Sequence, residues 1–191
     1  MSKKLNVTLM IASKTIRVFD LSIALFLLIV LSPLLLILFL LGWVDTKSPL
    51  FIQTRYGKNK KLITVVKFRS MKIDAPNISS ELIDSKYITS YGKIIRKAKL
   101  DELPQLWSVL RGDMSLVGPR PCLPSQEAVI KERERLGVFN VQPGITGLAQ
   151  VLKVDMSNPK LVAALDLKMI KRFSIKNYFF ILLSTLRTFI K

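Results

Sequence analysis

The 191-residue chain has no histidine and only one cysteine, Cys122. The lack of histidine excludes Ser-His-Asp and Cys-His catalysis, histidine general bases and histidine-ligated metals. One cysteine can form neither an internal disulfide nor a thiolate zinc site, which is typical of a protein from a reducing compartment. Any chemistry must therefore depend on carboxylates, cations, hydroxyls and hard metal ions.

Acidic residues are also scarce, with 13 Asp and Glu against 30 Lys and Arg, a formal net charge of +17. This excess predicts an anionic partner: nucleic acid, an anionic membrane surface or a phosphorylated substrate. Residues 47–72 and 86–99 are rich in Lys and Arg and contain no acid. Beside a membrane segment, such clusters are most simply explained by binding to anionic lipid headgroups. The sequence has no zinc-finger, helix-turn-helix or RNP pattern, and aromatic residues make up only 8%, which argues against nucleic acid as a partner.

The longest apolar feature is an uncharged run at residues 21–44. At about 1.5 Å per residue it makes a helix of roughly 36 Å, enough for the hydrocarbon core of a bilayer. The run is too long for a cleavable signal peptide, and no small-residue cleavage site follows it. It therefore predicts a membrane segment.

Two features bear on the path of this segment. Basic residues flank it on both sides, whereas the positive-inside rule predicts an asymmetry for a spanning helix. Ser32 and Pro33 lie in its middle, where proline removes a helical hydrogen bond and bends the helix, and where a serine hydroxyl can satisfy the freed carbonyl. A bent, re-entrant helix brings both ends to one face of the membrane, but proline also occurs in spanning helices. The residues alone leave both topologies open.

The rest of the chain is predicted to be α/β mixed, with more helix than strand. Its β-branched content predicts a strand at residues 62–68, which places Lys67 and Arg69 on one face. Two cations on one face can bind a pyrophosphate, or they can simply lie on a solvent-exposed edge of the strand. Helices are predicted at three places, the second ending at Gly137 and the third lying on the bilayer as an interfacial amphipathic helix: residues 103–110, 125–136 and 177–190.

The candidate chemistry begins at two adjacent acids, Asp101 and Glu102, just downstream of Arg96. Pro104 is expected in a first helical turn, where its missing N–H costs nothing. Asp101 then lies near the helix N-cap, where backbone donors favour its charged form. A capping role alone is the simpler explanation for this pair.

Two further segments are stiffened by proline. Arg120 lies between Pro119 and Pro121, and a guanidinium on such a rigid backbone can bind a phosphate with two hydrogen bonds. Residues 143–147 contain no ionisable group and indicate only a tight loop.

The order of these segments is more specific than any one of them. An apolar segment with Ser-Pro is followed by QTRYG, KFRSM, RKAKLDELPQLW, GDMSLVGPRP and PGITGLAQV. This series resembles the bacterial sugar transferase family, the monotopic polyprenyl-phosphate phosphoglycosyl transferases, from about residue 17 to the C-terminus. The length is similar to that of the minimal members.

The resemblance implies transfer of a sugar-1-phosphate from a UDP-sugar to polyprenyl (undecaprenyl) phosphate, with release of UMP, at the start of surface-glycan assembly. Asp101 would be the nucleophile that forms a phosphosugar-aspartyl intermediate, with Glu102 as its partner. Mg²⁺ would bridge Asp101 and the donor phosphates. Lys67, Arg96 and Arg120 match family positions that face the phosphates.

The resemblance also favours the re-entrant topology. Residues 1–46 would form the re-entrant membrane helix, kinked at Ser32 and Pro33, and residues 47–191 a compact catalytic domain. That domain would lie on the cytoplasmic face of the bacterial inner membrane, in contact with anionic lipids. The oligomeric state is left open, with a homodimer as one candidate.

The chain departs from the family pattern at two places near the predicted site. Ala98 and Lys99 precede the acidic pair where Thr-Ser is common, and the residues after Asp166 lack a tyrosine pair. Two alternatives to the covalent mechanism remain: direct transfer with Asp101 as a metal ligand only, and a non-catalytic basic membrane adaptor.

Overall fold

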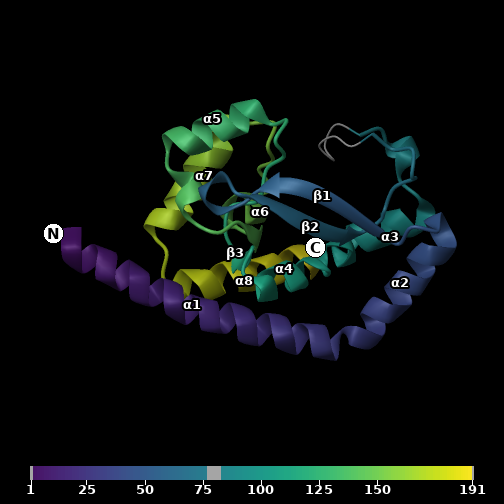
Figure 1. The fold of residues 1–191 in the computed structure, drawn as a ribbon, viewed down its shortest axis with the longest axis horizontal. Helices are drawn as coiled ribbons and strands as arrows, with labels where there is room; N and C mark the ends of the chain where they lie inside the picture. Colours follow the sequence, from purple (N-terminus) through teal and green to yellow (C-terminus); the bar gives the residue numbers. More distant parts are fainter. Residues whose placement is uncertain (1, 77–82, 191) are drawn as a thin grey trace.

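The computed structural model describes residues 2–76 and 83–190 and shows a helix-rich mixture of α and β structure, as predicted (Figure 1). It contains two small two-stranded sheets. The helices are α1 (Ser2–Val30), α2 (Ser32–Thr46), α3 (Ser90–Lys97), α4 (Gln105–Arg111), α5 (Glu127–Arg135), α6 (Leu148–Val151), α7 (Pro159–Lys171) and α8 (Ile175–Ile190). The strands are β1 (Leu50–Tyr56), β2 (Leu62–Phe68), β3 (Ser115–Val117) and β4 (Gly144–Thr146).

The apolar run is divided between α1 and α2, which meet at a sharp bend (Figure 1). Pro33 lacks the N–H that would bond to the carbonyl of Ile29, and the hydroxyl of Ser32 donates to that carbonyl instead, at 2.8 Å. Within residues 2–76 and 83–190, no single helix is both long and apolar enough to cross a bilayer. The segments Lys14–Val30 and Ser32–Thr46, which meet at a bend of 64°, are long and apolar enough to cross a bilayer only when they are taken together.

Both arms of the bent pair pack against the rest of the protein. Ile16 and Ala24 of α1 belong to the main core, which also contains residues of β2, α4, β3 and α8. Leu38 of α2 packs with Phe68 and Ile95 in a second cluster. In Figure 1 the two arms follow the outside of the molecule, with α4 and α8 alongside α1. Residues from both predicted segments, 1–46 and 47–191, therefore share one core, and their division into two domains stays a prediction.

Two charged residues near the start of the apolar run attach α1 to the protein. Arg17 donates to the carbonyls of Val109 and Leu110 near the end of α4, at 2.7 and 3.3 Å. Asp20 is 1% exposed and accepts hydrogen bonds from the backbone N–H of Leu116 and the hydroxyl of Tyr178, at 2.9 and 2.8 Å. Burial and the Asp20 charge raise the pKa of Tyr178, which therefore stays a donor. These contacts join α1 to α4, β3 and α8.

The strand predicted at residues 62–68 is confirmed as β2, which pairs antiparallel with β1 from Leu50↔Phe68 to Tyr56↔Leu62. β1 was not predicted from the sequence. The reason is that the buried positions of β1 are the polar Gln53 and Arg55, whereas the apolar Ile52 is 63% exposed. The usual alternation of apolar and polar positions is inverted in this strand.

The second sheet is a short parallel pair. β3 and β4 pair through Ser115↔Gly144 and Val117↔Thr146. A Cβ atom on Gly118 or Gly144 would collide with the backbone of the other segment, so both positions require glycine. The expectation of a simple tight loop at residues 143–147 was therefore wrong, because three of these residues form β4.

The three predicted helices are present as α4, α5 and α8. Gly137 follows α5 in the left-handed conformation, with φ 69°, as expected for a residue that ends a helix. Pro104 is the N-cap residue of α4 rather than a member of its first turn, which corrects the boundary by two residues.

Candidate functional site

Asp101 and Glu102 lie in a 3₁₀ turn, Leu100–Glu102, between α3 and α4. Lys99 enters this turn in the left-handed conformation, with φ 54°. The cap of α4 is Pro104 and has no side-chain cap hydrogen bond. The expectation that Asp101 lies near the N-cap of this helix was therefore wrong, and a capping role does not account for the acidic pair.

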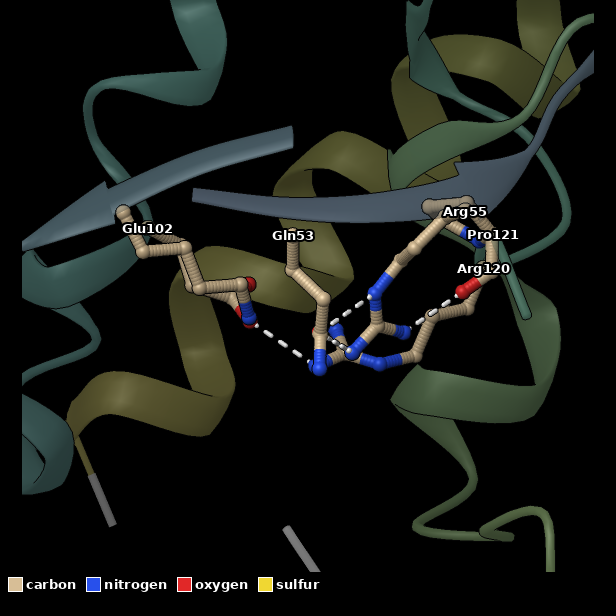
Figure 2. A network of polar contacts seen from close by, with 6 residues as sticks. Gln53, Arg55, Glu102, Arg120 and Pro121 are labelled. Carbon is tan, nitrogen blue, oxygen red and sulfur yellow. Dashed lines mark hydrogen bonds and ion pairs between the residues drawn. The ribbon is translucent and has the colours of Figure 1, made fainter. Parts of the chain in front are cut away.

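Glu102 is held between two cations. Its Oε1 accepts a hydrogen bond from Nζ of Lys67 at 2.6 Å. The same oxygen accepts a second from Nη2 of Arg120 at 2.9 Å (Figure 2). Burial raises the pKa of the Glu102 carboxyl, but the charges and hydrogen bonds of the two cations outweigh burial and hold it well below its usual range. Glu102 is therefore a permanently ionised group that fixes Lys67 and Arg120 in place.

Lys67 responds differently to the same surroundings. Burial lowers the pKa of Lys67 to about 8, the Glu102 charge opposes this shift, and the Arg120 and Arg55 charges add to it. The ammonium group is consequently charged at neutral pH, and it loses its proton more readily than an exposed lysine.

Asp101 makes fewer hydrogen bonds than Glu102. Its side chain is mostly buried, and Oδ1 has no hydrogen-bond partner among the described residues. Burial raises the pKa of the Asp101 carboxyl and the Glu102 charge adds to the rise, while nearby cations oppose it: Lys67, Arg96 and Lys99. A pair of carboxylates with pKa values shifted in opposite directions is typical of a site in which the two groups have different roles.

Two buried arginines hold the backbone that carries Arg120. Nη1 of Arg55 donates to the carbonyl of Pro121 at 2.6 Å, and Gln53 in turn accepts two hydrogen bonds from Arg55, at 3.0 and 2.7 Å (Figure 2). Nη1 of Arg133 donates to the carbonyl of Arg120 itself, at 2.6 Å. The sequence analysis assigned no role to Gln53, Arg55 or Arg133. The QTRYG segment was the signal for the first two, and nothing local distinguished Arg133 from other helix-surface arginines.

Arg133 is itself held by a buried ion pair with Asp166 of α7. Nε and Nη2 of Arg133 lie 3.0 and 2.8 Å from Oδ2 of Asp166, and the two side chains are 2% and 0% exposed. Burial raises the pKa of Asp166, and the Arg133 charge and hydrogen bond oppose the rise. The pair connects α5 and α7 to the segment that carries Arg120.

Three cavities meet at this group of residues. One, of about 170 Å³, is bordered by β1 and β2 and is lined by cations together with the acidic pair: Arg55, Lys67, Arg69, Lys72, Arg96, Lys99, Asp101, Glu102 and Arg120. A second, of about 510 Å³, shares three of these cations and adds Arg133 and Lys153. The third is a mainly aliphatic groove of about 450 Å³ between α1, α4 and α8, which reaches the same point.

The residues singled out from sequence divide into two groups. Lys67, Arg96, Asp101, Glu102 and Arg120 all line the first cavity, although they come from β2, α3, the 3₁₀ turn and the segment after β3. Ser32 and Pro33 lie at the bend between α1 and α2 and do not line that cavity.

Arg69 lines the first cavity as well, but its guanidinium is engaged by backbone. It donates to the carbonyls of Ser48 and Leu50, at 2.8 and 3.2 Å, and lies over the ring of Phe51. Arg69 therefore fastens the start of β1, and the cations that face the acidic pair come from elsewhere.

The fit of a divalent cation depends on Asp101. Within the part of the chain that the structure describes, no three His, Cys, Asp or Glu side chains gather at one point. Mg²⁺ is commonly bound through one or two carboxylates together with substrate phosphates, so such a cluster is not required. The shielded Oδ1 of Asp101, which lacks a hydrogen-bond partner in the described residues, fits this kind of binding.

Two adjacent carboxylates among several cations fit a site that binds phosphate groups together with a divalent cation. The chain matches the bacterial sugar transferase family over residues 11–191 and belongs to that family, which confirms the predicted resemblance.

Individual relatives are similar to this chain over most of its length. Undecaprenyl-phosphate glucose phosphotransferase of Komagataeibacter xylinus is 40% identical over 176 residues, which cover 83% of this chain and 32% of that protein. The exopolysaccharide production protein PSS of Rhizobium leguminosarum bv. phaseoli is 43% identical over 148 residues, 71% of this chain and 72% of the relative. UDP-glucose:undecaprenyl-phosphate glucose-1-phosphate transferase of Caulobacter vibrioides is 40% identical over 140 residues, 71% of this chain and 52% of the relative. The match thus spans about a third of the first protein and about half of the last.

The buried pair leads to a prediction about stability. Asp166→Asn leaves the Arg133 charge buried without its counter-charge, which we expect to lower the free energy of unfolding by about 3–5 kcal/mol. Thermal unfolding in detergent measures the change. Glu132→Gln is the matched control, because it removes an exposed ion pair on the same helix, α5, and is expected to leave the melting temperature unchanged. Equal melting temperatures for the two variants would contradict the prediction.

Proposed function

We propose that this protein transfers a sugar-1-phosphate from a UDP-sugar to polyprenyl (undecaprenyl) phosphate and releases UMP, through a phosphosugar intermediate on Asp101. The names of the Komagataeibacter and Caulobacter relatives support this choice of lipid acceptor, and the Caulobacter name supports a UDP-sugar donor. The observation that carries the proposal is that two adjacent carboxylates have different hydrogen-bond partners. Glu102 is committed to two cations, while Asp101 keeps an oxygen that accepts no hydrogen bond from the described residues.

The proposed reaction has two displacements at one phosphorus atom. An oxygen of Asp101 bonds to the β-phosphorus of the donor, the bond from that phosphorus to the bridging oxygen breaks, and UMP leaves with the electron pair. An oxygen of the lipid phosphate then bonds to the same phosphorus, and the bond to Asp101 breaks. Both steps need an ionised nucleophile and no histidine base, in keeping with the composition of the chain.

The residues around Asp101 would supply positive charge. Phosphoryl transfer depends chiefly on positioning and on neutralising the phosphate oxygens, and Lys67, Arg96 and Arg120 line the same cavity as Asp101. Glu102 would hold Lys67 and Arg120 at the correct separation. Mg²⁺, bound by Asp101 and the donor phosphates, would add further positive charge.

We also propose that α1 and α2 form a re-entrant membrane hairpin, with the catalytic part on the cytoplasmic face of the bacterial inner membrane. The 64° bend, the basic flanks and a row of exposed apolar side chains on α1 and α2 support this: Leu25, Phe26, Ile29, Leu36, Ile37 and Leu40. A large exposed apolar surface on a protein marks an interaction site, here a membrane. The basic surface beside it would bind anionic lipids.

The topology can be tested with single cysteines at the exposed positions Lys14 and Lys47, on either side of the hairpin. We expect a membrane-impermeant maleimide to label both from the same side of sealed vesicles. Labelling from opposite sides would mean that the segment spans the membrane. The wild-type chain is the background control, since Cys122 is buried.

The covalent mechanism can be tested without the acceptor. Purified protein is mixed with Mg²⁺ and a panel of UDP-sugars, and intact mass and released nucleotide are measured. We expect an added phosphosugar mass and about one equivalent of UMP per protein, both lost in Asp101→Asn, because the reaction stops at the enzyme-bound intermediate. Asp45→Asn, the same substitution at an exposed position of α2, should behave like wild type.

Other outcomes of this experiment would identify the alternatives. UMP release that requires polyprenyl phosphate, with no adduct, would indicate direct transfer with Asp101 as a metal ligand. A protein that releases no UMP from any donor, yet binds anionic vesicles equally well after Asp101→Asn, would be a membrane adaptor.

The lowered pKa of Lys67 predicts a pH dependence. Because its pKa is about 8, Lys67 is charged below that value and becomes neutral above it, so kcat/KM for the donor should fall as pH rises through about 8. Lys67→Arg stays charged throughout this range and should remove the fall near that pH. The measurement is the pH profile of UMP release for both proteins. Superimposable profiles would show that a different group titrates.

A further inference from the structure

The aliphatic groove contains the features that an isoprenoid chain with a phosphate at one end would need. Its walls come from α1, α4, β3, β4, α6 and α8, and apolar side chains face it: Ile23, Leu27, Leu106, Leu116, Ile145 and Leu186. The volume of about 450 Å³ is in the range of small-molecule binding sites. The nucleotide and sugar of a donor are polar, and their hydrogen-bonding groups would find no partners on these apolar walls.

The hydroxyl groups in the groove do not make it polar. Oγ1 of Thr146 and Oγ1 of Thr185 lie 2.7 Å apart and bond to each other, and the Thr185 hydroxyl also donates to the carbonyl of Ile181. Since each hydroxyl bonds within the wall, the threonines offer mainly their methyl groups to a ligand.

The inner end of the groove is charged. Lys99, Glu102 and Arg120 line it, and all three also line the cationic cavity that contains Asp101. Gln150 lies at the same end and also lines the second cationic cavity. Its amide oxygen and nitrogen are shielded from solvent and have no hydrogen-bond partner in the described residues. Two cations and an uncommitted amide at the end of an apolar groove match a phosphate joined to a hydrocarbon chain.

The outer end of the groove opens among the helices with exposed apolar surfaces. Leu186 of α8 lines the groove and is 56% exposed, and Phe26 of α1, next to the groove residue Leu27, is 63% exposed. A hydrocarbon chain that leaves the groove beside Leu186 and Phe26 would meet apolar side chains.

We propose that this groove binds the phosphate-proximal isoprene units of the lipid acceptor, with the lipid phosphate at Lys99, Arg120 and Gln150. The inference rests on the proposed function, since it assigns the acceptor of that reaction to one of the three cavities. It also separates the substrates in space: the donor reaches Asp101 through the cationic cavity beside β1 and β2, and the acceptor phosphate reaches the phosphorus on Asp101 from the groove.

The test compares two substitutions on α8. Leu186→Trp fills the groove, while Leu183→Trp places the same ring on the same helix at a residue that is equally exposed and does not line the groove. The full-length protein in nanodiscs is assayed with a UDP-sugar and undecaprenyl phosphate. We expect Leu186→Trp to raise the acceptor KM about tenfold, equivalent to the loss of about two buried methylene groups, with the donor KM within twofold of wild type. Leu183→Trp should match wild type in both constants.

A second measurement does not depend on turnover. Undecaprenyl phosphate with a diazirine on an isoprene unit near the phosphate is photolysed with the wild-type protein, and the labelled peptides are identified by mass spectrometry. We expect labelling on β4, α8 and the groove face of α1, and competition by unlabelled undecaprenyl phosphate but not by anionic phospholipid.

The outcomes separate this inference from the proposed function. If wild type transfers sugar phosphate but the two tryptophan variants have equal acceptor KM values, or if the label is found only outside the groove, the acceptor binds elsewhere and the groove inference is wrong. If phospholipid competes as well as undecaprenyl phosphate, the groove is a general lipid site. If wild type itself shows no transfer with any donor while the label still reaches the groove, the proposed reaction fails and the lipid site stands.

Discussion

The arrangement of the site depends on the attachment of α1 to the rest of the molecule through Asp20. This carboxylate lies at the start of the apolar run, is almost fully buried, and accepts hydrogen bonds from the backbone of β3 and from Tyr178 of α8. A buried carboxylate without partners would be strongly destabilising, so the two donors are required wherever α1 packs. β3 leads directly to Arg120, and α1 and α8 form two walls of the aliphatic groove. One carboxylate thus sets the position of the proposed membrane helix relative to the cationic site.

A second set of contacts fixes Arg120. Prolines on either side limit its backbone, but its direction is set by Arg55 and Arg133, which bond to consecutive carbonyls of that segment. Both arginines are buried, and each is bound to a polar partner, Gln53 or Asp166. Burying these charged groups costs desolvation free energy, and their ion pairs and hydrogen bonds offset that cost. The result is a guanidinium held rigidly against Glu102 before any substrate arrives, which favours electrostatic catalysis.

Lys99 shows how a departure from the family pattern can be accommodated. It occupies a left-handed backbone position, which is unfavourable for a residue with a Cβ, and it lines all three cavities that meet at the acidic pair. A cation at this junction lies where the donor phosphates and the lipid phosphate would both approach. The strained backbone at this position is consistent with a functional requirement for the turn that presents Asp101.

The sequence by itself determined the features that depend on short-range patterns. Periodicity and composition were enough for the apolar run with its Ser32-Pro33 interruption, for the strand at residues 62–68 and for three helices, and the order of the motifs identified the family and five residues that line one cavity. Tertiary structure alone decided the rest. β1 was hidden because its buried face is polar, and β3 and β4 were hidden because three residues are too few for a period to appear. The contacts of Arg55 with Pro121 and of Asp20 with Tyr178 join residues 66 and 158 positions apart, and the aliphatic groove is assembled from six separate α-helices and β-strands. Such features arise from packing between distant segments, and no local pattern of residues encodes them.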